Sequence, residues 1–142
     1  MSGASDILND IEGMRVLVIG LARSGRAAAS LLAHLGARVV GTDLRESLDG
    51  LDALGEAGVE LQLGGQRTEL VHDADMVVLS PGVPLQAPIP VEARRLGVTC
   101  MGELELAARL LEAKGAIPLV AVTGTNGKST TAALCAHLLE HK

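Results

Sequence analysis

Short runs of β-branched and aliphatic residues alternate along the chain with longer stretches rich in Ala and Leu. The runs have the length of buried strands, and the stretches carry apolar residues at the spacing of a helix. Glycine follows most of these segments, where it can end a helix or open a turn. We expect strands at 15–19, 38–42, 59–63, 75–79, 98–100 and 117–122, and helices at 24–35, 49–57, 89–96, 103–113 and 129–141.

The order of these elements predicts the fold class. Strands that alternate with helices are typical of a parallel sheet with helices on both faces. The runs VLVI at 16–19 and MVVL at 76–79 are apolar at every position, as in strands that are buried on both sides. We therefore expect an α/β fold. The buried face of the helix at 103–113 is predicted to carry Leu104, Ala107, Ala108 and Leu111.

The length of 142 residues fits one ordinary domain, or one domain with a fragment of another. A strand, a glycine-rich loop and a helix are predicted after residue 116, and a single strand and helix cannot bury their own apolar faces. We therefore expect one domain at residues 1–115. Residues 116–142 are expected to open a second domain that continues beyond Lys142.

The composition argues against several classes of function. The chain has no Phe, Tyr or Trp, and it therefore lacks the aromatic platforms on which proteins stack single-stranded bases. Its net charge of -5 argues against binding to a nucleic-acid backbone.

Cys100 and Cys135 have no metal-ligand spacing, and we expect both to be buried. No basic leader and no apolar run of membrane-spanning length is found, so we expect a cytoplasmic protein without a membrane partner.

A glycine-rich turn, GLARSG at 20–25, lies between the first predicted strand and the first helix. It is a GxAxxG variant of the GxGxxG fingerprint of dinucleotide-binding proteins. Gly20 would allow the tight turn, and Gly25 would let the helix approach the sheet. The free N–H groups at the helix start attract phosphate, and Arg23 and Ser24 add a cation and a hydroxyl there. The turn therefore predicts a phosphate site.

Two further loops are expected at the same edge of the sheet, where open α/β sheets bind ligands. Asp43 and Arg45 follow the second strand, and SPGVP at 80–84 follows the fourth. An NAD enzyme would use Asp43 on ribose hydroxyls. Another nucleotide could use the aspartate and the neighbouring backbone for its base, with Arg45 stacking on the ligand or pairing with a phosphate. The three loops together predict a nucleotide pocket.

The most specific motif is TGTNGKST at 123–130, between a predicted strand and a predicted helix. Backbone N–H groups of such a loop wrap phosphates, a lysine places a charge near the β- and γ-phosphates, and a hydroxyl binds Mg²⁺. Lys128 and Ser129 would take these two roles. The common pattern GxxxxGK[ST] has its first glycine where this chain has Val122, so the loop is a variant.

This loop resembles the ATP loop of the Mur ligases and of their folylpolyglutamate synthetase relatives. The runs VLVIGLARSG at 16–25, SPGVP at 80–84 and GELEL at 102–106, with Asp43 and Arg45, resemble the Mur ligases that add D-glutamate. The resemblance covers nearly the whole chain in order. The folylpolyglutamate synthetases have no UDP domain before their ATP loop, so the first hundred residues argue against that branch.

The resemblance implies an enzyme of peptidoglycan synthesis with three domains. Residues 1–115 would be its Rossmann-like domain for the UDP part of UDP-N-acetylmuramoyl-L-alanine, and residues 116–142 would begin its central ATP-binding domain. ATP and Mg²⁺ would activate the substrate carboxylate as an acyl phosphate, which D-glutamate attacks. The remaining metal ligands and the D-glutamate site would lie beyond Lys142. The chain alone is therefore expected to bind the UDP part without catalysing.

The resemblance also assigns residues to each part of the site. The diphosphate would meet Arg23, Ser24 and Gly25, and the uridine would meet Asp43, Leu44, Arg45 and Gly82. ATP would be held by Gly124, Thr125, Asn126, Gly127, Lys128, Ser129 and Thr130, with Lys128 as the catalytic charge stabiliser and Ser129 as a magnesium ligand. Two other classes stay open: an NAD-binding oxidoreductase domain, which would explain Gly20 and Asp43 but not the ATP loop, and a non-catalytic nucleotide-binding module.

Overall fold

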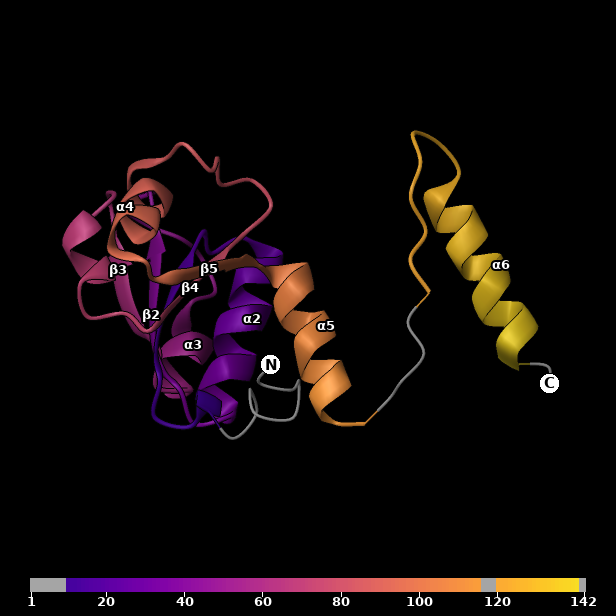
Figure 1. The fold of residues 1–142 in the computed structure, drawn as a ribbon, viewed down its shortest axis with the longest axis horizontal. Coiled ribbons are helices and arrows are strands. Elements are labelled where there is room, and N and C mark those ends of the chain that lie inside the picture. The colour runs from indigo at the N-terminus through magenta and orange to yellow at the C-terminus, as the bar shows by residue number, and fades with distance from the viewer. Residues whose placement is uncertain (1–9, 116–119, 141–142) are drawn as a thin grey trace.

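Five parallel strands form the centre of the molecule, as the computed structural model of residues 10–115 and 120–140 shows (Figure 1). Their order in the sheet is β3-β2-β1-β4-β5. The chain therefore leaves β1 toward one side of the sheet and later returns to the other side for β4. In open α/β sheets this reversal marks the place where ligands bind. The strands are β1 (Arg15–Ile19), β2 (Arg38–Asp43), β3 (Glu60–Leu63), β4 (Met76–Leu79) and β5 (Thr99–Gly102).

Helices cover both faces of the sheet, as predicted. One face packs against α2, α3 and α5, and the other packs against α4 and a short 3-10 helix, η1. No helix among the described residues is long and apolar enough to cross a membrane. The helices are α2 (Arg23–His34), α3 (Asp52–Glu56), η1 (Thr68–Val71), α4 (Pro88–Leu96), α5 (Glu103–Ala113) and α6 (Lys128–Glu140).

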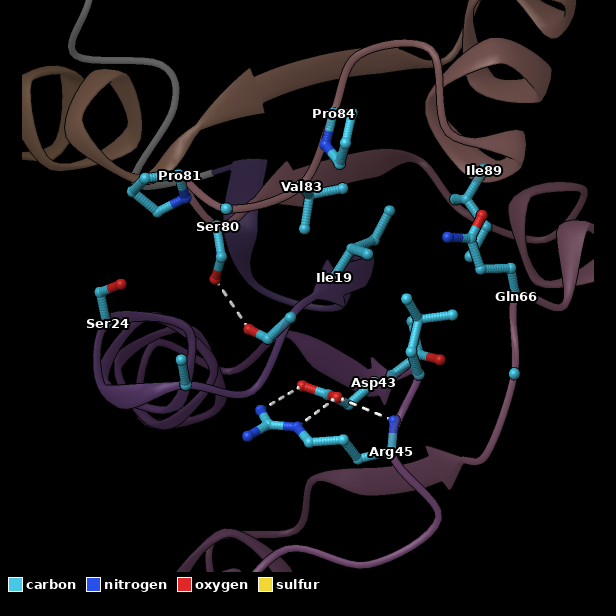
Figure 2. A pocket seen from close by; sticks show the side chains of 16 residues that line it. Ile19, Ser24, Asp43, Arg45, Gln66, Ser80, Pro81, Val83, Pro84 and Ile89 are labelled. Carbon is cyan, nitrogen blue, oxygen red and sulfur yellow. Dashed lines mark hydrogen bonds and ion pairs between the residues drawn. The ribbon is translucent and has the colours of Figure 1, made fainter.

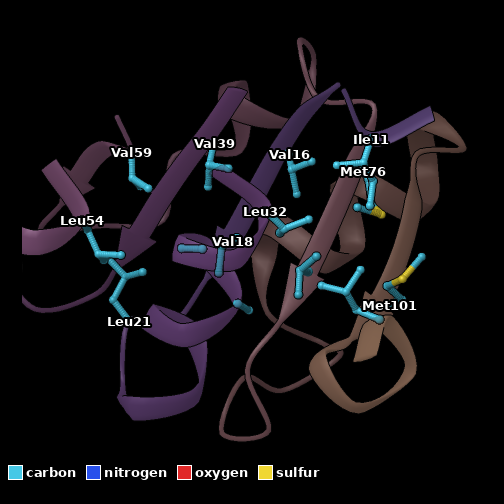
Figure 3. Close-up of a cluster of buried hydrophobic side chains, with 14 of the residues drawn as sticks. Ile11, Val16, Val18, Leu21, Leu32, Val39, Leu54, Val59, Met76 and Met101 are labelled. Carbon is cyan, nitrogen blue, oxygen red and sulfur yellow. The ribbon is translucent and has the colours of Figure 1, made fainter. Parts of the chain in front are cut away.

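The central strand β1 is buried on both sides because its alternate side chains enter two different cores. Val16 and Val18 lie in the larger cluster with Leu32 of α2 (Figure 3). Leu17 and Ile19 lie in the smaller cluster, beneath α4 and η1. This arrangement explains why the run is apolar at every position. It also fixes the end of β1 firmly, and the first turn of the candidate site follows directly.

The buried face of α5 differs from the predicted one. Leu106 and Leu110 are buried, whereas Leu104 is 86% exposed. The helix carries leucines at helical spacing on two faces, so the pattern alone does not select one of them. Leu106 and Leu110 pack in the larger core cluster, and Glu103 at the start of the helix contacts Ser80, which follows β4. Positions three and seven residues further along then face the same way.

The structure describes only the second half of the predicted strand at 117–122. Residues 117–119 lie outside the described residues, and residues 120–122 have no strand structure. A strand needs a hydrogen-bonded neighbour, and no described strand lies beside this segment. The helix α6 follows, one residue earlier than predicted, and none of its described residues is buried. Figure 1 shows α6 apart from the sheet.

The two cysteines are more exposed than predicted. Cys100 is exposed, on the edge strand β5, and Cys135 is partly exposed, on α6. Edge strands and unpacked helices do not enclose their side chains. The expectation of two buried cysteines is therefore wrong, although neither residue belongs to the candidate site.

Candidate functional site

The strands β1, β2 and β4 end level with one another at one edge of the sheet. Ile19 pairs with Thr42 of β2 and with Leu79 of β4. The backbone N–H of Gly20 donates to the Thr42 carbonyl at 2.8 Å, and that of Ser80 donates to the Ile19 carbonyl at 3.0 Å. The three predicted loops therefore meet at this edge.

A pocket of about 440 Å³ opens where these loops meet (Figure 2). Its walls are mostly apolar, with a few polar groups, as is typical of small-molecule sites. Of the residues predicted to meet the UDP part, five line this pocket: Ser24, Asp43, Leu44, Arg45 and Gly82.

Arg23 and Gly25, also predicted to meet the ligand, do not line the pocket. Arg23 is exposed on the first turn of α2. Gly25 is buried beneath the turn, where a Cβ atom would lie 1.8 Å from the Gly20 carbonyl oxygen and 2.6 Å from Ser80 Oγ. Gly25 therefore lets α2 approach the sheet, as its place in the motif predicts, and shapes the turn from below.

The N-terminus of α2 opens into the pocket. Ala22, its N-cap residue, and Ser24 both line the pocket. No side chain of the described residues caps this end, and the first turn carries no acidic residue. The first N–H groups of a helix lack partners within the helix, and they carry the positive end of its dipole. This end of the pocket can therefore bind an anionic group such as phosphate.

Asp43 is held on all sides by hydrogen bonds. Its Oδ1 accepts from the Nε of Arg45 at 2.9 Å and from the backbone N–H of Arg45 at 3.0 Å. Its Oδ2 accepts from Arg45 Nη2 at 2.9 Å and from the backbone N–H of Leu21 at 2.8 Å. The Arg45 guanidinium, helped by these backbone N–H groups, holds the pKa of the Asp43 carboxyl well below its usual range, against the opposing effect of burial.

These four hydrogen bonds define what Asp43 can do in the site. A carboxylate offers about four lone-pair positions, and all of them are occupied here. Asp43 therefore ties the turn after β1 to the loop after β2 and fixes the orientation of Arg45. The Arg45 side chain is 55% exposed, so N–H groups that Asp43 does not use can reach a ligand.

Ser80 links three elements, and sequence analysis missed this link. Its Oγ lies 2.7 Å from the Gly20 carbonyl oxygen and 2.5 Å from Oε1 of Glu103, the first residue of α5. The serine is 5% exposed. The loop after β4, the turn after β1 and the start of α5 are thus joined through one hydroxyl. No local pattern signals this contact, because 23 residues separate Ser80 from Glu103.

Replacing Ser80 with alanine is expected to lower the free energy of unfolding by roughly 1–2 kcal/mol, because the Gly20 carbonyl and the Glu103 carboxylate lose the single hydroxyl proton that they share. Urea denaturation followed by circular dichroism measures this change. The matched control is Ser47→Ala, at an exposed position, with an expected change below about 0.5 kcal/mol. Equal denaturation midpoints for the two variants would contradict the importance of the link.

Two pocket residues had no place in the sequence-based prediction. Gly65 and Gln66 follow β3 and line the pocket together with the loops after β1, β2 and β4. The strand β3 carries no recognised motif, so nothing in the sequence marks the loop after it. Only the sheet order, which places β3 beside β2, brings this loop to the pocket.

The predicted ATP residues lie together in the exposed loop before α6 and in its first turn. Gly124 and Gly127 adopt positive φ values of 151° and 76°, which favour glycine. The Nζ atom of Lys128 donates to the Gly124 carbonyl at 2.5 Å. The described residues contain no cluster of three His, Cys, Asp or Glu side chains that could hold a metal. The loop thus offers a lysine, hydroxyls and a helix N-terminus, which suit phosphate groups.

Comparisons with known proteins agree with this arrangement. A family model described as "Mur ligase MurD-like, N-terminal domain" matches residues 14–102. The chain is 52% identical over 132 residues to the UDP-N-acetylmuramoylalanine–D-glutamate ligase of Anaeromyxobacter dehalogenans, covering 92% of this chain and 28% of that protein. It is 47% identical over 131 residues to the protein of the same name from Salinibacter ruber, covering 92% and 27%.

Solved structures of similar fold come from related ligases. The UDP-N-acetylmuramate-alanine ligase MurC from Thermotoga maritima matches with a TM-score of 0.61 and 29% identity, over 90% of this chain and 29% of that one. A pseudomurein peptide ligase type C from Methanothermus fervidus matches with a TM-score of 0.60 and 26% identity, over 84% and 24%. The chain spans little more than a quarter of the curated relatives it matches. On the match over residues 14–102, the chain belongs to the Mur ligase MurD-like family, whose N-terminal domain it contains.

Proposed function

We propose that this chain is the N-terminal part of a cytoplasmic, ATP-dependent ligase that joins D-glutamate to UDP-N-acetylmuramoylalanine, and that its pocket binds the UDP part of that substrate. One observation carries the proposal. The pocket lies at the carboxyl edge of β1, β2 and β4, with the uncapped N-terminus of α2 opening into it. The names of the chain's relatives supply the substrate class.

The two ends of the pocket suit the two parts of a nucleoside diphosphate. The diphosphate lies at the N-terminus of α2, where backbone N–H groups and the Ser24 hydroxyl donate hydrogen bonds. The uridine lies between the loops that carry Leu44, Arg45 and Gly82. Arg23, exposed on the same helix turn, adds positive charge near the diphosphate without lining the pocket. Gly25 and Asp43 act by shaping the turn and holding Arg45.

We further propose that the loop at 123–130 holds ATP and Mg²⁺, with residues 116–142 as the beginning of the ATP-binding domain. ATP supplies the phosphoryl group that activates the substrate carboxylate. Lys128 would release the Gly124 carbonyl and place its charge on the phosphates, and Ser129 would offer its hydroxyl to the metal. The D-glutamate site and the other metal ligands would come from the rest of the full-length enzyme, so the chain alone does not catalyse.

The hydrogen bonds of Asp43 argue for a uridine ligand rather than NAD. An NAD-binding domain uses the acidic residue after its second strand to accept hydrogen bonds from the ribose hydroxyls. In this chain the lone pairs of Asp43 are already taken by Arg45 and by the Leu21 backbone. The aspartate would have to release Arg45 before it could bind a ribose. A ligand that uses the Arg45 side chain needs no such rearrangement.

An NMR titration of the ¹⁵N-labelled chain tests the proposal. UDP and UDP-N-acetylmuramoyl-L-alanine are expected to shift the amide signals of Ser24, Leu44 and Gly82, and Mg-ATP is expected to shift those of residues 124–130. NAD is expected to shift neither set. Shifts at the pocket with NAD alone would support an oxidoreductase domain, and an absence of shifts with any UDP ligand would overturn the proposal. Formation of ADP that depends on D-glutamate would show that the chain alone catalyses, contrary to expectation.

A further inference from the structure

Arg26 of α2 contacts the turn after β1 from behind the pocket. Its Nε atom donates a hydrogen bond to the Leu21 carbonyl at 2.8 Å. The side chain is partly buried, and no carboxylate of the described residues forms an ion pair with it. Its charge therefore acts on backbone carbonyl oxygens. Hydrogen bonds from a charged donor are stronger than those between neutral groups, so Arg26 fixes the orientation of the Leu21 carbonyl.

The loop after β2 holds the guanidinium in this place. Nη1 of Arg26 donates to the Asp49 carbonyl at 2.7 Å and to the Gly50 carbonyl at 3.2 Å. Gly50 has a φ value of 70°, and a Cβ atom at this position would lie 3.2 Å from Nη1. Glycine therefore leaves room for the guanidinium beside the carbonyl that it binds. Because the planar guanidinium donates in several fixed directions, one side chain holds the loop and the turn together.

The Leu21 carbonyl determines where the next backbone N–H points. In a trans peptide the C=O of one residue and the N–H of the next point in opposite directions, and no described peptide bond is cis. The Ala22 N–H therefore points away from Arg26. Ala22 lines the pocket, and its N–H has no acceptor among residues 10–115 and 120–140. This N–H is available to an anion in the pocket.

Two charged side chains hold the two sides of Leu21. Asp43 accepts a hydrogen bond from the Leu21 N–H at 2.8 Å, and Arg26 donates to the Leu21 carbonyl. The first contact fixes the peptide before Leu21, and the second fixes the peptide after it. A donor that is already oriented binds a ligand more tightly, because the ligand does not have to order it. Without Arg26, the peptide that carries the Ala22 N–H loses this restraint.

We propose that Arg26 is a positioning residue for the binding of a diphosphate. It holds the Leu21–Ala22 peptide so that the Ala22 N–H is ready to donate to a phosphate oxygen. Arg26 does not itself line the pocket, so it acts through the backbone. This inference rests on the proposed function, in that a nucleoside diphosphate occupies the pocket.

An NMR titration of the ¹⁵N-labelled full chain with UDP, pyrophosphate and uridine tests the proposal. UDP and pyrophosphate are expected to move the Ala22 amide proton of the wild type downfield, because that proton gains a hydrogen bond. Uridine has no phosphate and is expected to leave this signal in place. The Gly82 signal is expected to move with UDP and with uridine.

Variants of Arg26 separate its geometry from its charge. Arg26→Met removes all three hydrogen bonds, and it is expected to weaken UDP binding about tenfold. At saturating UDP this variant should lose most of the Ala22 shift and keep the Gly82 shift. Arg26→Lys retains the charge without the planar fork, and we expect it to bind UDP as weakly as Arg26→Met within about threefold. The matched control, Arg38→Met, removes an exposed arginine at the other end of β2 and should behave as wild type.

The outcomes separate this inference from the proposed function. If the wild-type chain binds UDP without a shift of the Ala22 signal, the inference is wrong, and this result needs no variant. If Arg26→Lys binds UDP as wild type does, charge alone is sufficient and the inference is wrong. Equal loss of the Ala22 and Gly82 shifts in a folded Arg26→Met would show a general structural role instead. If UDP does not bind to the wild type, the proposed function falls and the inference falls with it.

Discussion

Gly25→Ala is expected to lower the free energy of unfolding by about 3 kcal/mol or more, although alanine is the better helix former. Gly25 lies in the first turn of α2, and a Cβ atom there would meet the Gly20 carbonyl oxygen at 1.8 Å. That oxygen belongs to the backbone, so a side-chain rotation cannot relieve the contact. Either α2 or the turn after β1 has to move. The pocket changes shape as a result, because Gly20 of the turn and Ser24 of α2 both line it. Urea denaturation of the variant measures the loss.

Gly55→Ala provides the matched control within the same chain. Gly55 also lies in a helix, α3, but a Cβ atom there would meet nothing within 4 Å. Without a steric clash, alanine should raise the free energy of unfolding by about 0.5–1 kcal/mol, as in other helices. The same substitution is thus expected to have opposite signs at the two positions. If Gly25→Ala were as stable as wild type, the close approach of α2 to the turn would not be a feature of the folded protein.

The contrast between these glycines shows what a local motif can predict. The GLARSG turn at 20–25 carries its own constraints, because its glycines and the following helix lie next to one another in sequence. The strands and helices of the sheet are likewise marked by local patterns. These signals were enough to predict the α/β fold. They also predicted that the loops after β1, β2 and β4 lie at one edge of the sheet, as the structure confirms.

Other contacts of the site join residues that lie far apart in the sequence, and no sequence pattern predicts them. The hydroxyl of Ser80 meets Glu103, and the carboxylate of Asp43 meets the backbone of Leu21. Each contact depends on the register of neighbouring strands, which is set by the whole core. The face of α5 was mispredicted for the same reason. Its leucine pattern allows two faces, and only the packing against the core shows that Leu106 and Leu110 are on the buried one.

Asp43→Asn should lower the free energy of unfolding by about 2 kcal/mol near neutral pH, because asparagine cannot accept all four hydrogen bonds or balance the charge of Arg45. Asp43 is 8% exposed, so water replaces little of what is lost, whereas the 55% exposure of Arg45 limits the ionic part of the effect. Urea denaturation at pH 7 measures the change. The control Asp49→Asn removes the same charge from an exposed position and should change stability by less than about 0.5 kcal/mol.

The pH dependence of stability shows whether Asp43 stabilises the fold through the charge of its carboxylate or only through the shape of its side chain. The pKa of Asp43 is lowered in the folded protein by Arg45, whereas in the unfolded chain it returns to about 3.9. The carboxylate therefore stabilises the fold fully above the unfolded pKa, and this stabilisation is lost as the pH falls toward the lower pKa of the folded state. Wild type should lose stability more steeply than Asp43→Asn between about pH 5 and pH 2, and the two curves should converge in acid. Parallel curves over that range would mean that Asp43 contributes through its shape and not through its charge, and that Arg45 is positioned by other contacts.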